Sequence, residues 1–394
     1  MTRPRLQRAG VHRIACAVVA SEVRRLRKGD TVWTGPNDWS EATPIGEDEA
    51  GIGLGLDSLE QLGALGALAE TFDLDDSLLG REPPCTVGGW IDWIMAGHAG
   101  NDGRITVRTS GSTGHPLPCI HVVADLLDEA AYLAAQLGAR RRVVALVPAH
   151  HLYGMIWTAL LPDALDVPVV VRMVGTPLDL LPGDLVVAVP NQWQGLQRLT
   201  RRFPEDVIGV SSAGPLEADT ADALLAAGLA RLVDVYGSSE TGAIGLRDLP
   251  ARDYVLLPRW TLAGDVDGDD WYLVDPTGTR INLPDHIERT GERALRPIGR
   301  RDGAVQVGGH NVWPDRVARL LQQADGVADA AVRLHTNGRL KAFIVPVDGH
   351  DRDSLSTHLD HVVATRLTSH ERPRMFHFGA SLPRNTMGKL EDWT

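Results

Sequence analysis

The sequence predicts an α/β protein with a large lobe, a smaller α+β carboxyl-terminal lobe and a helical segment before them. In the middle of the chain, short runs of β-branched residues alternate with helical or loop segments, as in α/β sheets. These runs are 142–148, 167–174, 184–190, 207–211 and 231–236. After Gly299 a smaller mixed pattern begins, and before residue 100 apolar residues recur at helical spacing. We therefore expect three regions, at 1–100, 101–299 and 300–394.

The N-terminal region is expected to hold three helices. Apolar residues at threes and fours predict the first helix over 11–26, and the stretch 31–55, rich in Gly, Pro and acidic residues, predicts a long loop. The second helix should begin near Ser58, and the third should cover 87–96.

The carboxyl-terminal region is expected to form its own α+β lobe. Helical patterns at 314–324 and 353–368 alternate with strand patterns at 327–334 and 339–347, and a further strand is expected near Phe376.

Composition and charge narrow the classes of function. Of the 394 residues, 43% are hydrophobic and 23% are charged, which excludes a disordered chain. The net charge of −12 repels phosphate backbones, so we expect no nucleic-acid partner. The three cysteines are an odd number without metal-ligand spacing, which supports neither a disulfide framework nor a structural zinc site, so the reducing cytoplasm is the default location. The apolar run 14–20 is too short for a membrane span, and we expect neither a membrane association nor an export signal.

A Ser/Thr/Gly run follows the first strand pattern of the large lobe. Residues 109–114 read Thr-Ser-Gly-Ser-Thr-Gly, and glycines let a backbone fold closely around an anion such as phosphate. The spacing is not that of the Walker loop. A surface turn has the same composition, so the run alone leaves both interpretations open.

A second motif ends an apolar strand with a small-residue turn. Residues 235–242 read Val-Tyr-Gly-Ser-Ser-Glu-Thr-Gly, and the carboxylate of Glu240 could bind magnesium, which prefers oxygen ligands. A solvated turn glutamate is the alternative. The carboxyl end of a strand, where α/β folds usually bind ligands, favours the magnesium ligand.

Two further motifs lie in the last hundred residues. The segment 299–302 reads Gly-Arg-Arg-Asp and is followed by the Val- and Gly-rich stretch 304–312. Near the end of the chain, 382–389 reads Leu-Pro-Arg-Asn-Thr-Met-Gly-Lys. A lysine on a mobile lobe could bring its positive charge into a closed site. An ordinary charged tail, however, has the same composition.

These four motifs, in this order, resemble the adenylate-forming superfamily of acyl-CoA synthetases, nonribosomal adenylation domains and luciferases. The resemblance covers residues 104–394. It implies a large lobe joined by a hinge at Asp302 to a mobile small lobe, with ATP and Mg²⁺ as the cofactors. It also implies Glu240 as the magnesium ligand, Lys389 as the lysine that contacts the acyl phosphate, and His151 at the gate or facing the substrate carboxylate.

The same resemblance implies a set of nucleotide-binding residues. Tyr236 would stack near adenine, and Asp285 would bind the ribose. The full set is Thr109, Ser110, Gly111, Ser112, Thr113, Gly114, Ser212, Ala213, Gly214, Tyr236, Gly237, Ser238, Ser239, Asp285 and Arg300.

Two positions depart from the superfamily pattern. Leu117 stands where the phosphate loop normally has lysine, and His115, Arg247 or Arg300 are candidates to supply the missing cation. Asp285 follows Leu-Pro, where the superfamily has Thr-Gly. A non-catalytic, ligase-like module that binds nucleotide or a partner is therefore the alternative to an enzyme.

The large lobe resembles a truncated one, because little sequence precedes its phosphate loop. In that place, 55–59 (Gly-Leu-Asp-Ser-Leu) and 86–94 resemble an acyl carrier protein, in which Ser58 would carry phosphopantetheine. A serine at a helix start is exposed, and the positive helix end suits a phosphate. Alternatively, Asp57 and Ser58 only cap a helix that packs on the shortened lobe.

The chain as a whole resembles compact aryl-acid ligases of aryl polyene and xanthomonadin-type pathways. The expected reaction is ATP-dependent activation of a small, aromatic carboxylic acid as acyl-AMP, followed by transfer to a thiol. The acceptor could be coenzyme A, a separate acyl carrier protein or an arm on Ser58. Tyr153, Trp157 and Trp193 could line the acid pocket, although core positions are commoner for such residues.

Overall fold

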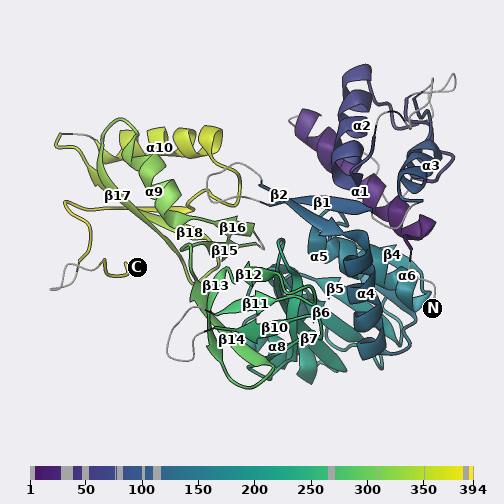
Figure 1. The fold of residues 1–394 in the computed structure, drawn as a ribbon. Coiled ribbons are helices and arrows are strands. Elements are labelled where there is room, and N and C mark those ends of the chain that lie inside the picture. The colour runs from purple at the N-terminus through teal and green to yellow at the C-terminus, as the bar shows by residue number, and fades with distance from the viewer. Residues whose placement is uncertain are drawn as a thin grey trace. The chain divides into compact units, whose positions relative to one another are not determined.

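The chain divides into two units. The first unit contains a sheet whose central strands are parallel (Figure 1). The computed structural model describes residues 5–27, 39–46, 53–75, 77, 83–99, 103–109, 117–264, 271–308, 310–349, 351–384 and 390–393. The first unit comprises Met1–Thr109, Pro116–Ser212 and Leu216–Leu257, and the second comprises Ser110–His115, Ala213–Pro215 and Pro258–Thr394.

In the first unit the strand order is β4-β3-β5-β6-β7-β8-β9. The strands are β3 (Arg142–Ala145), β4 (Val169–Val171), β5 (Asp184–Ala188), β6 (Ile208–Ser211), β7 (Arg231–Ser238), β8 (Gly242–Asp248) and β9 (Tyr254–Leu256). The strands from β4 to β7 pair in parallel, whereas β8 and β9 continue the sheet antiparallel. The α/β prediction is thus confirmed, and the parallel strands have their carboxyl ends at one edge.

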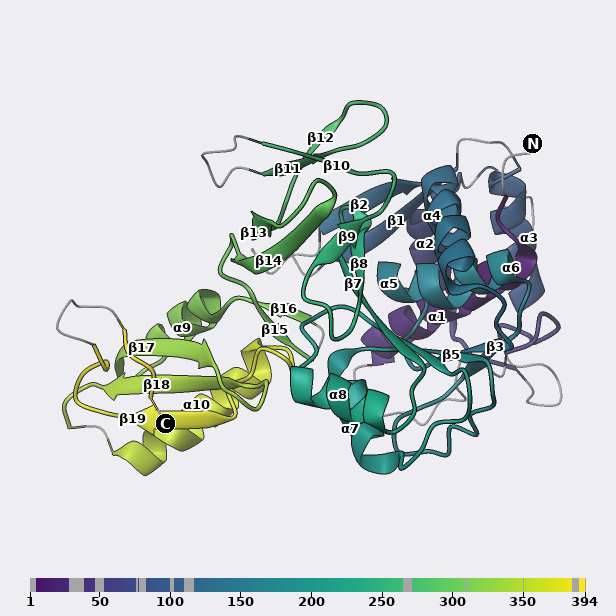
Figure 2. The same cartoon turned by 90° about the horizontal axis from the view of Figure 1, so that it is seen from below.

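Helices cover this sheet because its strands are apolar on both faces. The helical segments are α4 (Val123–Leu137), α5 (Leu152–Met155), a π-helical stretch (Ile156–Leu160), α6 (Leu161–Leu165), α7 (Pro190–Leu199) and α8 (Ala218–Ala226). α7 and α8 lie side by side (Figure 2) and share one core with β3, β5 and β7. A separate hairpin, β1 (Arg104–Thr109) with β2 (Leu117–Val122), flanks residues 110–116.

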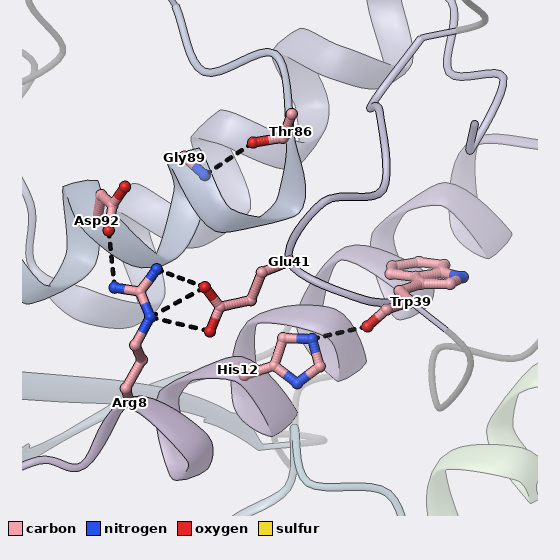
Figure 3. Close-up of polar contacts among 7 residues, drawn as sticks. All are labelled: Arg8, His12, Trp39, Glu41, Thr86, Gly89 and Asp92. Carbon is pink, nitrogen blue, oxygen red and sulfur yellow. Dashed lines mark hydrogen bonds and ion pairs between the residues drawn. The ribbon is translucent and has the colours of Figure 1, made fainter. Parts of the chain in front are cut away.

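The N-terminal helices are α1 (Arg8–Arg27), α2 (Ser58–Phe72) and α3 (Val87–Gly97), close to the predicted ranges. Figure 3 shows Arg8 of α1 joining two other segments, at 2.6 Å from Glu41 and 2.7 Å from Asp92 of α3. His12 donates from Nε2 to the carbonyl of Trp39 at 2.7 Å. α1 packs against both α2 and α3, so the three helices form one layer.

This layer is packed onto the sheet-bearing part of the same unit. Arg13 of α1 lies 2.8 Å from Oδ1 of Asp163 in α6, and the amide of Gly10 donates to Oδ2 of Asp163 at 3.0 Å. A Cβ atom at Gly10 would lie 2.4 Å from that oxygen, so only glycine allows the approach. The contact fixes α1 to the lobe.

The second unit contains a series of short strands and the α+β lobe. The first strands are β10 (Thr261–Ala263), β11 (Tyr272–Val274), β12 (Arg280–Asn282), β13 (Asp285–Arg289), β14 (Ala294–Arg300), β15 (Val305–Val307) and β16 (His310–Val312). The lobe follows with α9 (Pro314–Gln322), β17 (Val327–Leu334), β18 (Leu340–Pro346), α10 (Arg352–Arg366) and β19 (Met375–Phe378). Both helices share one apolar core with the sheet β17-β18-β19, as the sequence patterns predicted.

Candidate nucleotide and acid site

Three of the predicted segments follow parallel strands of the first unit. His151 comes after β3, Ser212 directly follows β6, and Glu240 follows β7. The hydroxyl of Ser212 donates to the carbonyl of Val235 at 2.9 Å, which ties the end of β6 to β7. These elements therefore meet at the sheet edge where α/β folds bind ligands.

The ring of Tyr236 is largely buried, at 9% exposure. Its centroid lies 5.5 Å from that of Tyr254 in β9. The hydroxyl of Tyr254 donates to Oδ2 of Asp234 at 2.6 Å, and burial together with that carboxylate raises the pKa of Tyr254. Tyr236 is thus supported by a neighbouring ring that is itself fixed.

Arg247, one of the residues expected to replace the missing phosphate cation, is paired with Asp234. Its Nε and terminal nitrogen donate to Oδ2 of Asp234 at 2.9 and 2.7 Å, and it also donates to the carbonyl of Arg252 at 3.0 Å. The guanidinium is committed to a buried carboxylate. Sequence reasoning missed Asp234 and Tyr254, which lie outside every motif considered.

The turn 238–242 carries Glu240 at the end of β7. Within it, the amide of Ser238 donates to Oγ1 of Thr241 at 3.1 Å, and the amide of Glu240 donates to Oγ of Ser238 at 3.3 Å. Gly237 is exposed, and Ser239 is half-buried. The side chain of Glu240 is exposed, so a ligand can reach it.

The donors at this turn fit magnesium that arrives with a nucleotide. Magnesium is usually held by one or two carboxylates plus substrate phosphates and keeps several waters. In the part of the chain that the structure describes, no group of three or more His, Cys, Asp or Glu side chains could hold a metal. A single exposed carboxylate suits a metal shared with phosphate.

The two adjacent histidines after β3 have different environments. His151 is exposed, whereas Nδ1 of His150 is buried and has no hydrogen-bond partner among the described residues. Burial, followed by the nearby His151 and Arg24, lowers the pKa of His150 to about 3. His150 is therefore neutral at physiological pH, and His151 is the ring accessible to substrate.

Two of the three aromatic residues expected to line an acid pocket are fully buried in the core, whereas Tyr153 is half-buried. Trp157 and Trp193 are 1% and 0% exposed. Nε1 of Trp193 donates to the carbonyl of Val210 at 3.1 Å, and the hydroxyl of Tyr153 donates to the carbonyls of Ala188 and Val210 at 3.0 and 3.1 Å. The polar atoms of Trp193 and Tyr153 therefore bind backbone carbonyls of β5 and β6.

In the second unit, three predicted residues form one cluster. Asp285 and Arg300 pair across β13 and β14, with 4.0 Å between Oδ1 and Nε. Arg300 also lies 2.8 Å from Asp302. Burial opposes ionisation of Asp302, but hydrogen bonds from Arg300 and from the amide of Ala304 outweigh it and lower its pKa. The guanidinium therefore joins the expected ribose ligand to the expected hinge.

Most of the expected phosphate loop and the expected catalytic lysine lie outside the part of the chain that the structure describes. Ser110, Gly111, Ser112, Thr113, Gly114 and Lys389 lie outside the described residues, as does His115. Only the backbone of Thr109 is described, as the last residue of β1. Ala213 has φ of 65° and Gly214 has φ of 158°, so the turn after Ser212 holds a non-glycine residue in a left-handed conformation. Such backbone strain is common at ligand sites.

Comparisons with known proteins agree with this arrangement. The profile of a family described as AMP-binding enzyme matches residues 104–292. A 4-coumarate–CoA ligase from Halorhodospira halophila is 40% identical over 85% of this chain and 87% of its own length. The chain belongs to the AMP-binding enzyme family.

Two further proteins extend the comparison. A 4-coumarate–CoA ligase from Cereibacter sphaeroides is 35% identical over 98% of this chain and 97% of its own. The solved structure of o-succinylbenzoate CoA synthetase from Bacillus subtilis superposes with a TM-score of 0.60 at 20% identity, covering 73% of this chain and 67% of that one, which shows a common fold.

Membership of the AMP-binding family establishes the reaction class. The chain is an AMP-forming acid–thiol ligase: it activates a carboxylic acid with ATP as acyl-AMP and transfers the acyl group to a thiol. This result favours the enzyme over a non-catalytic module. In the described part of the chain, no helix is both long and apolar enough to cross a membrane.

Ser58 is exposed in this ligase, as the first residue of α2. Asp57 accepts from the amide of Glu60 at 2.8 Å, and Glu60 accepts from the amide of Asp57 at 3.1 Å, which forms a capping box. Glu60 also binds Arg27 of α1. The capping role of Asp57 is thus confirmed, and α2 is tied to α1.

Proposed function

We propose that this ligase activates 4-coumarate or a closely related hydroxycinnamic acid and transfers it to coenzyme A. The observation that carries the proposal is the similarity to two ligases named for 4-coumarate, one of them over 98% of this chain. The second aligns over the N-terminal region as well, which supports a shared compact architecture.

The proposed first step joins the acid to AMP. A carboxylate oxygen attacks the α-phosphorus of ATP, the bond to the β-phosphoryl group breaks, and pyrophosphate leaves. Glu240 would hold magnesium, which offsets phosphate charge when bound. Tyr236 would stack on adenine, Asp285 would bind the ribose, and His151 would face the carboxylate.

In the proposed second step, the thiolate of coenzyme A attacks the acyl carbon and AMP leaves. Between the steps, the small lobe would turn about Asp302 and remove Lys389 from the acyl phosphate. The anchoring of Asp302 by Arg300 supports this position as a defined pivot.

The test is pyrophosphate release from ATP across a panel of hydroxycinnamic, benzoic and aliphatic acids. We expect a selective signal with 4-coumarate, followed by formation of its CoA thioester when coenzyme A is added. Lys389→Ala should lose acyl-AMP formation while keeping its fold, and Lys28→Ala is the matched control. Equal rates with aliphatic acids would overturn the proposed acid class.

Ser58 remains a second candidate for the acceptor. Leu59 and Leu62 beside it are 66% and 68% exposed, so a partner enzyme could approach this end of α2. Intact mass after incubation with coenzyme A and a phosphopantetheinyl transferase decides the matter. A mass gain of one phosphopantetheine that Ser58→Ala abolishes would support a carrier; no gain would leave free coenzyme A as the acceptor.

A further inference from the structure

The turn that carries Glu240 is held by a histidine from outside the sheet. His121 of β2 donates from Nε2 to the carbonyl of Ser239 at 2.7 Å. The imidazole is 8% exposed, so water competes little for this hydrogen bond. The contact fixes the peptide immediately before Glu240.

A buried carboxylate holds the other side of the same turn. Glu129 of α4 is 3% exposed and accepts from the amide of Ala243 at 3.1 Å. Gly242, which directly precedes Ala243, has φ of 71°, and a Cβ atom there would lie 2.6 Å from Oε2 of Glu129. Only glycine fits at position 242, because a side chain there would be strained by the positive φ and would clash with the carboxylate of Glu129.

These two contacts bracket an exposed side chain. Ser239 directly precedes Glu240, and Ala243 follows it by three positions. An exposed turn that lacked outside contacts would sample several orientations and would lose entropy on binding a metal. Here β2 and α4 hold the backbone of the turn, while the carboxylate of Glu240 stays accessible.

We infer that His121 and Glu129 are positioning residues that orient Glu240 for the magnesium–nucleotide complex. The inference rests on the proposed role of Glu240. His121 belongs to β2, so one hydrogen bond connects this strand with the turn that carries the expected metal ligand.

The test measures binding of α,β-methylene ATP by calorimetry, with and without magnesium. We expect His121→Ala to weaken the magnesium complex about tenfold, the equivalent of one lost hydrogen bond and some orientation. Binding of AMP without magnesium should not change. His121→Gln, which can still donate to the carbonyl of Ser239, should restore part of the affinity and replaces the alanine variant if that does not fold.

The chain offers a matched control in His98. Its Nε2 donates to the carbonyl of Phe72 at 2.8 Å, so it makes the same kind of contact in the N-terminal layer. His98→Ala should lower the melting temperature without changing magnesium-dependent affinity. Equal effects of His98→Ala and His121→Ala on that affinity, or an equal loss of AMP binding in His121→Ala, would overturn the inference.

Glu240→Gln separates this inference from the role on which it rests. If Glu240→Gln removes the magnesium dependence and His121→Ala does not weaken it, the positioning role is wrong and the role of Glu240 stands. If Glu240→Gln has no effect, the magnesium role of Glu240 is wrong, and the positioning role falls with it. Neither outcome depends on the identity of the acid.

Discussion

Arg247 and Asp234 form a buried ion pair across β7 and β8, with 2.7 Å between a guanidinium nitrogen and Oδ2. Asp234 is 1% exposed, so its charge depends on Arg247 and on the hydroxyl of Tyr254. Because the ring of Tyr254 contacts that of Tyr236, this pair also stabilises the wall of the candidate adenine site.

Removal of Arg247 should therefore destabilise the first unit strongly. We expect Arg247→Met to lower the free energy of unfolding by roughly 3–5 kcal/mol, because it leaves a buried carboxylate uncompensated. Tyr254→Phe should cost about 2 kcal/mol, for one hydrogen bond to a charged group. Urea unfolding measures both.

The exposed pair of Arg231 and Asp248 on the same two strands is the control, at 2.7 Å. Arg231→Met should cost about 1 kcal/mol or less, since water screens exposed ion pairs. Equal losses in Arg231→Met and Arg247→Met would contradict the claim that burial makes the difference.

Deletion of residues 1–102 distinguishes a separate carrier domain from a structural layer. In α1 the side chains of Val11, Ile14 and Val19 are fully buried. Asp163 of α6 forms an ion pair with Arg13 and accepts a hydrogen bond from the amide of Gly10. We expect the chain that begins at Gly103 to lose cooperative thermal unfolding, because it exposes the surface that α1 covers. Retained cooperativity with full acyl-AMP formation would show that the N-terminal region is dispensable.

Much of the fold could be predicted because its signals are local. The start of α2 at Ser58 follows from Asp57 and Glu60, which cap within one turn, and the start of α3 follows from Thr86, which accepts from the amide of Gly89 at 3.2 Å. The α+β lobe follows in the same way from hydrophobic periodicity.

The network beneath Tyr236 could not be predicted, because it depends on strand register. Arg247 lies opposite Asp234 only in the observed pairing of β7 with β8, 13 positions along the chain. Sequence alone left Arg247 as a candidate phosphate cation and Trp193 as a candidate pocket residue. Each role was predicted from the type of residue, whereas the hydrogen-bond partner that the residue contacts is determined by the tertiary structure.

Cys119 of β2 reports on the surroundings of Glu240. Burial, together with the charge of Glu240, raises the pKa of the Cys119 thiol to about 11. We expect iodoacetamide at pH 8, without nucleotide or metal, to modify exposed Cys85 well before Cys119, since only the thiolate reacts. Glu240→Gln should speed modification of Cys119, as followed by peptide mass spectrometry, whereas Glu217→Gln should not. If Cys119 is modified at the same rate in Glu240→Gln, the charge of Glu240 does not act on the Cys119 thiol.

A stacked histidine pair should make the α+β lobe sensitive to mild acid. The rings of His310 and His370 lie 3.8 Å apart. Burial lowers the pKa of both, and for His370 the nearby His310 and Arg339 add to the effect, while Glu371 opposes it.

Because these pKa values lie below the usual value of about 6.5, the unfolded chain binds more protons than the folded chain just below that pH. The free energy of unfolding that depends on two neutral imidazoles is therefore fully present above pH 6.5. It is lost as the pH falls towards the lowered pKa values of His310 and His370. His370→Asn should flatten this decline, whereas His358→Asn, an exposed position on α10, should not. Urea midpoints between pH 5 and 8 measure the slope, and imidazole NMR should show His370 titrating below pH 6.5. A slope that His370→Asn leaves unchanged would mean that other groups cause the acid sensitivity.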